Sequence, residues 1–152
     1  MGSGIIFGNS ILDVVFIAWF IAQFYKVVTS LIVDKKINIK RFWETGGMPS
    51  SHSSTVSALT TSIGIVYGTS SVFFAISIVF AIVVMHDAAG IRRSAGQQAS
   101  VLNKLSATLS NIFEKHFGEE QLKELLGHTP VEVMIGAILG VVVAFIFKFH
   151  LL

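Results

Sequence analysis

The stretch GGMPSSHSS, which occupies residues 46–54, decides how this chain folds. Its two glycines allow the backbone to approach a ligand closely, and Pro49 followed by serines is typical of the start of a helix. A helix that begins here directs its unbonded N–H groups and the positive end of its dipole at the preceding loop. The stretch therefore predicts an anion-binding helix N-terminus that carries His52 in its first turn.

The composition around this stretch is that of a membrane protein. Of the 152 residues, 53% are hydrophobic and only 13% are charged, whereas soluble domains carry roughly 25% charged residues. The chain has no cysteine, which excludes a disulfide framework and a thiolate metal site. No positively charged segment precedes the first apolar run, so we do not expect a secretory signal peptide.

The hydropathy pattern predicts a single all-α domain over residues 1–152, a polytopic membrane helix bundle. About 20 apolar residues are needed to cross a bilayer. Four runs are candidates for transmembrane helices: 11–33, 50–67, 72–91 and 130–148. The second run is rich in serine and threonine, so we place it inside the bundle, away from lipid.

Two further features concern packing. Residues 97–126 have apolar side chains at helical spacing between polar ones, which predicts an amphipathic helical segment that lies on the membrane surface or caps the bundle. Gly136, Gly140 and Ala144 form a small-residue seam along the last run. Short spans with such a seam suit a homodimer.

The distribution of basic residues predicts the orientation in the membrane. Four spans place nine of the eleven Lys and Arg residues on one side: Lys35, Lys36, Lys40, Arg41, Arg92, Arg93, Lys104, Lys115 and Lys123. The positive-inside rule makes this side cytoplasmic. His52, Arg92, Arg93 and His128 are then all expected at the cytoplasmic face.

A second motif, GHTPVE at residues 127–132, precedes the last run. A helix that starts at Thr129 or Pro130 brings Glu132 within reach of His128, and a carboxylate on one imidazole nitrogen leaves the other as a nucleophile or base. Thr129 and Glu132 also have the spacing of a capping box, with Pro130 at the first helical position. The two interpretations are compatible.

Four other residues are candidates on weaker grounds. Arg92 and Arg93 have two interpretations: their guanidinium groups bind phosphate oxygens, or they supply only interfacial charge. Lys26 lies within the first span, where an ionisable residue is a functional candidate unless it snorkels to the interface. Asp87 pairs with an arginine, orients a histidine or binds a metal. A metal site built from His52, Asp87, His128 and Glu132 is a further alternative.

The motifs resemble those of a known superfamily. Residues 49–52, Pro-Ser-Ser-His, resemble the Pro-Ser-Gly-His motif of the type 2 phosphatidic acid phosphatases, a superfamily that includes the vanadium haloperoxidases. Residues 127–140 are similar to its third motif, in which a histidine and an acidic residue open a Gly-rich helix. With Asp-Ala-Ala-Gly-Ile-Arg-Arg at 87–93, the whole chain resembles the small, divergent bacterial branch of this superfamily.

This resemblance implies an integral membrane phosphatase of the bacterial cytoplasmic membrane. It would hydrolyse a lipid phosphate or pyrophosphate monoester through a phosphohistidine, with no metal or other cofactor and no nucleic-acid partner. His128 would be the nucleophile, Glu132 its orienting group and His52 the acid for the leaving oxygen. The implied phosphate-binding residues are Gly47, Ser50, Ser51, Arg92 or Arg93, and Lys26.

The chain departs from the superfamily pattern at two points, which leaves a second function open. Ser51 replaces a glycine, and about 35 residues separate Arg92 and Arg93 from His128, where the superfamily has six. The alternative is a catalytically degenerate membrane protein that binds or translocates an anionic lipid.

Overall fold

The computed structural model describes residues 4–34, 47–113 and 127–152. In these ranges every regular element is a helix: α1 (Ser10–Asp34), α2 (Ser51–Tyr67), α3 (Val72–Ala89), α4 (Ile91–Phe113), α5 (Pro130–Ile146) and α6 (Lys148–Leu151). The all-α membrane bundle is confirmed, and α1, α2, α3 and α5 begin and end within two residues of the expected runs. Residues 35–46, which include four of the basic residues, and residues 114–126 of the expected amphipathic segment lie outside the described residues.

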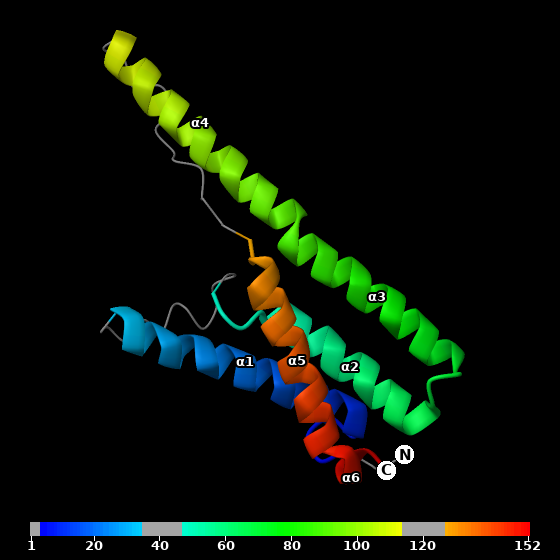
Figure 1. The fold of residues 1–152 in the computed structure, drawn as a ribbon. Helices are drawn as coiled ribbons and strands as arrows, with labels where there is room; N and C mark the ends of the chain where they lie inside the picture. The colour runs from blue at the N-terminus through cyan, green and yellow to red at the C-terminus, as the bar shows by residue number, and fades with distance from the viewer. Residues whose placement is uncertain (1–3, 35–46, 114–126) are drawn as a thin grey trace.

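The helices differ in how well each suits a bilayer. Residues Ser10–Thr29 of α1 and the helical stretch that begins at Val72 are long and apolar enough to cross a membrane, and α5 is a shorter apolar helix. The polar helix α2 packs against α1, α3 and α5 and lies between them (Figure 1). Six of its eight serines and threonines are buried, which agrees with the predicted place of this helix inside the bundle.

Hydroxyl groups of α2 hold it to its neighbours through hydrogen bonds. Ser54 Oγ donates to the Ala18 carbonyl of α1 over 3.2 Å, and Thr60 Oγ1 donates to the Ser77 carbonyl of α3 over 3.1 Å. All four residues are buried. Because water is excluded from such an interior, each hydroxyl is satisfied only by bonding to protein. The polarity of α2 thus stabilises the bundle.

The closest helix contact is between α2 and α5, along the small-residue seam. A Cβ atom on Gly136 would overlap the Ser50 carbonyl oxygen, and a Cβ atom on Gly140 would overlap the Ser54 carbonyl oxygen. Only glycine allows two helix backbones to approach this closely. The seam is therefore buried inside one chain and is not free to form an interface between chains, while the homodimer itself stays a prediction.

At the end of the bundle opposite the N-terminus of α2, a buried carboxylate joins the two ends of the chain. Asp13 accepts hydrogen bonds from the backbone N–H groups of residues 5–7 at 2.6–3.2 Å, and its Oδ2 lies 3.3 Å from His150 Nε2 of α6. Asp13 is 1% exposed, so these partners replace its hydration. The pair therefore fixes α6 and the N-terminal loop against α1.

Helix α4 stands apart from the bundle. It begins at Ile91, directly after the break at Gly90, and continues roughly in the direction of α3, away from the other helices (Figure 1). Among the described elements it contacts only α3. The expected amphipathic helix is present but starts six residues earlier than predicted, and its described part does not cap the bundle.

The seam gives a prediction about stability. We expect Gly140→Ala to lower the free energy of unfolding in detergent by about 1–3 kcal/mol, because the added methyl group forces two backbones apart. Gly64→Ala is the matched control, since its Cβ would meet only the edge of the Phe74 ring, at 3.0 Å. Denaturant titration followed by circular dichroism measures both. Equal effects of the two substitutions would contradict the role assigned to the seam.

Candidate functional site

Three helix ends meet at the site: the starts of α2 and α5 and the end of α3. The Ser50 N–H, just before α2, donates to the Glu132 carbonyl of α5 over 3.1 Å. The His128 N–H, just before α5, donates to the Ala88 carbonyl near the end of α3 over 3.1 Å. These two backbone bonds hold the two motif loops side by side. The Ala88 contact had no signal in the sequence, because any residue supplies a carbonyl.

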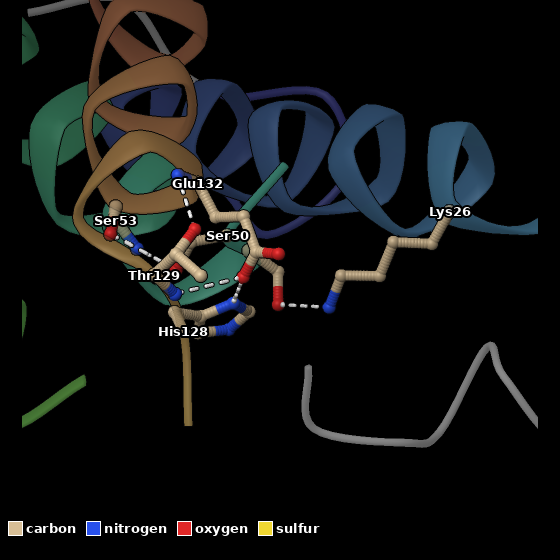
Figure 2. A network of polar contacts seen from close by, with 7 residues as sticks. Lys26, Ser50, Ser53, His128, Thr129 and Glu132 are labelled. Atoms are coloured by element: carbon tan, nitrogen blue, oxygen red, sulfur yellow. Dashed lines mark hydrogen bonds and ion pairs between the residues drawn. The ribbon is translucent and has the colours of Figure 1, made fainter. Parts of the chain in front are cut away.

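His128 is oriented by Glu132. Its Nδ1 lies 3.1 Å from Glu132 Oε2 (Figure 2), and its side chain is 3% exposed. A carboxylate only accepts hydrogen bonds, so Nδ1 is the protonated nitrogen and Nε2 carries the lone pair. The arrangement suits a nucleophile or base that acts through Nε2.

The same glutamate completes a capping box at the start of α5. Glu132 Oε2 also accepts from the Thr129 N–H at 3.1 Å, and the Glu132 N–H donates to Thr129 Oγ1 at 3.3 Å. The sequence left open whether Glu132 caps the helix or holds the histidine. It does both through one oxygen, so the helix start fixes the position of the carboxylate that holds His128.

His52 lies across from His128, in the first turn of α2. The two ring centroids are 6.3 Å apart and the ring planes meet at 64°. Two imidazoles at this separation can both contact one small oxyanion placed between them. The two histidines are 76 positions apart in the chain, and the α2–α5 contact brings them together.

Ser50, directly before α2, uses its side chain to cap the helix and not to face the site. Ser50 is the N-cap, and its hydroxyl accepts from the Ser53 N–H at 3.4 Å and from Ser53 Oγ at 3.0 Å (Figure 2). Its side chain therefore caps the helix. Gly47 precedes it with a φ of +81°, a conformation that glycine adopts without strain.

Lys26 extends from α1 into the site. Its side chain is 4% exposed, and Nζ donates to Ser51 Oγ over 3.2 Å (Figure 2). A buried ammonium group is costly unless it is paired or hydrogen-bonded. The Ser51 hydroxyl thus provides a partner for the cation at the position where the superfamily motif has glycine. Lys26 does not snorkel, because it is held inside the bundle.

The remaining candidates are placed less fully. Asp87 is half-buried in the last turn of α3, and Arg92 and Arg93 lie in the first turn of α4, with side chains outside the described part of the structure. In the ranges that are described, no three His, Asp or Glu side chains gather in a way that could hold a metal ion. The geometry therefore gives no support to the metal-site alternative.

Comparison with known proteins identifies the family to which the chain belongs. The family model described as the divergent PAP2 family matches residues 7–143. The chain belongs to the divergent PAP2 family. It is also 41% identical over 137 residues to the uncharacterized membrane protein YuiD of Bacillus subtilis, a match that covers 84% of this chain and 87% of that protein. No solved structure matches.

In this divergent PAP2 family member, the capping box gives a prediction about stability. Thr129→Ala removes the acceptor of the Glu132 N–H, and we expect a loss of about 0.5–2 kcal/mol in the free energy of unfolding. Thr129→Ser retains an acceptor oxygen and is the control. Thermal unfolding in detergent measures both, and an alanine variant as stable as the serine variant would refute the cap.

Proposed function

We propose that this protein is an integral membrane phosphatase that hydrolyses a lipid phosphate or pyrophosphate monoester through a phosphohistidine. The observation that carries the proposal is the pair His52 and His128, which face each other across the site. His128 is held in place by the Glu132 carboxylate. Membership of the divergent PAP2 family supports the same chemistry. The basic residues that the sequence pattern assigns to the same membrane side as His52 and His128 favour a site that faces the cytoplasm.

The proposed reaction has two steps. His128 Nε2 attacks phosphorus, a P–N bond forms, and the P–O bond to the lipid breaks while His52 gives its proton to the leaving oxygen. Water then attacks the phosphohistidine, His52 takes a proton from that water, and the P–N bond breaks to release phosphate. Glu132 holds Nδ1–H throughout and stabilises the positive charge that develops on the His128 ring.

Charge on the phosphoryl oxygens needs preorganised donors. Among the described residues, Lys26 of α1 supplies a positive charge at the site. The N-terminus of α2 adds backbone N–H groups and a favourable dipole. We propose that a phosphate oxygen replaces the Ser51 hydroxyl as the partner of Lys26. Arg92 and Arg93 follow the end of α3 and are proposed to add bidentate contacts.

A groove supports a lipid as the substrate. It has a volume of about 460 Å³ and runs between α2, α3 and α5, the helices that also frame the site. Its lining is mainly apolar and includes Ile65, Phe74, Met85 and Phe145. Met85 lies one turn before Ala88, whose carbonyl binds the His128 backbone. We propose that the groove holds a hydrocarbon chain of the substrate.

The test of catalysis is release of phosphate by purified protein in mixed micelles. Phosphatidate, phosphatidylglycerophosphate and a polyprenyl pyrophosphate are the substrates to compare. We expect His128→Ala to abolish turnover and His52→Ala to lower kcat by about 10²–10⁴-fold, because the leaving oxygen loses its acid. Brief reaction with ³²P-labelled substrate and an alkaline quench should trap acid-labile label on His128.

His150→Ala is the control for this experiment, because His150 lies with Asp13 at the other end of the bundle. It should keep the turnover of the wild type in protein that remains folded. The proposal fails if no substrate is turned over, or if turnover survives in both His128→Ala and His52→Ala.

The alternative function, binding or translocation of an anionic lipid without hydrolysis, is favoured by one observation. The Ser51 hydroxyl accepts a hydrogen bond from Lys26. It stands where the superfamily motif has glycine, a residue small enough to let phosphate approach. A degenerate site would retain the cation and the helix N-terminus but would lack turnover. Equilibrium binding of vanadate and of phosphatidate separates the two functions.

Lys26→Met gives a prediction for this binding. We expect it to weaken vanadate binding at least tenfold, because a charge-assisted hydrogen bond is worth about 1.5–3 kcal/mol. Lys26→Arg should recover part of the affinity, and Lys148→Met, on α6, should leave it unchanged. Saturable binding without phosphate release would favour the alternative function, whereas unaltered binding by Lys26→Met would remove Lys26 from the site.

A further inference from the structure

The face of α4 that bears its leucines has no partner in the described structure. Val101, Leu102 and Leu105 are each more than half exposed, and α3 is the only described helix that α4 contacts. The helix is 23 residues long and projects from the bundle as a continuation of α3 (Figure 1). An apolar stripe on an isolated helix is covered either by another protein surface or by a membrane.

The spacing of these residues follows a heptad repeat. Positions 91, 95, 98, 102, 105, 109 and 112 alternate steps of four and three residues, and they carry Ile, Ala, Gln, Leu, Leu, Leu and Ile. This is the a/d pattern of a coiled coil, sustained over three heptads with a single polar position, Gln98. Two identical helices in parallel register would place Gln98 opposite its own copy, where the side chains can hydrogen-bond.

The charges on α4 argue against a membrane surface as the partner. Helices that lie on anionic membranes are rich in Lys and Arg on their polar face. The basic residues of α4 are Arg92 and Arg93 in its first turn and Lys104; from residue 94 to 113 the other polar residues are Ser, Thr, Asn and Gln. Apart from Arg92 in the first turn, the positions that flank the apolar stripe in a heptad (Ser94, Ala99, Val101, Ser106, Thr108 and Phe113) are uncharged, so little charge repulsion opposes a second copy beyond that turn.

We infer that α4 forms a parallel two-stranded coiled coil with the α4 helix of a second copy of this chain. Insertion in one orientation presents α4 of every copy on the same side of the membrane, which selects the parallel arrangement. Confinement to the bilayer also raises the effective concentration of the two helices, so three heptads suffice where a free peptide would be marginal. The interface is independent of the glycine seam, which is buried within each chain.

Disulfide cross-linking tests this interface, because the chain has no cysteine of its own. Single substitutions Leu102→Cys, Leu105→Cys and Leu109→Cys, at core positions, are compared with Ser100→Cys and Ala107→Cys on the opposite face. The full-length protein in vesicles of phosphatidylglycerol and phosphatidylethanolamine is oxidised with copper phenanthroline. We expect the core positions to give dimers severalfold faster than the opposite face.

A second measurement uses the mass of the protein–detergent complex by light scattering. Leu105→Glu should convert dimers to monomers, whereas Lys104→Glu, one position away, should leave them intact. Equal cross-linking at all five positions, or none, overturns the inference. The inference is also overturned if vesicles protect the core cysteines from a water-soluble maleimide while no cross-link forms. That result would mean that the apolar stripe lies on the membrane.

Discussion

The close approach of α2 and α5 is the contact on which the rest of the structure depends. Glycines at 136 and 140 bring the α5 backbone against the carbonyl oxygens of Ser50 and Ser54. Two helices that pack this tightly at their N-terminal ends also place their two N-terminal dipoles side by side, which concentrates positive potential there. Among the described helices, the seam is thus both a contact of two backbones and the reason that two helix N-termini lie side by side.

Burial of polar groups follows from that contact. With α2 at the centre, its hydroxyls and the Lys26 ammonium group lie away from lipid and water, where each needs a protein partner. Ser54 and Thr60 use these bonds to hold neighbouring helices, whereas Lys26 donates to a neutral partner, the Ser51 hydroxyl. A buried cation next to a helix N-terminus is stabilised when an anion enters. This property suits both proposed functions, hydrolysis of a lipid phosphate and binding of an anionic lipid.

The two ends of the bundle use carboxylates for different purposes. Asp13 is enclosed by backbone N–H groups and His150, a set of contacts that joins the ends of the chain. Glu132 faces a histidine that in turn faces a second histidine. Residue type alone does not separate these roles, since each site is an acidic residue beside a histidine. The neighbours of the histidine make the difference, and they come from other helices.

The sequence by itself determined the membrane class, the bounds of α1, α2, α3 and α5, and the capping box. These depend on local features: apolar runs matched to a bilayer and side chains three or four residues apart. It also identified His52, His128 and Glu132 as candidates. Only the tertiary structure decided that the glycine seam is internal, that Ser50 caps α2, that Lys26 reaches Ser51, and that α4 leaves the bundle. Those facts depend on which helix faces are opposed, and backbone carbonyls such as that of Ala88 carry no signal in the sequence. The physical reason is that packing joins residues far apart in the chain, whereas residue patterns report only on near neighbours.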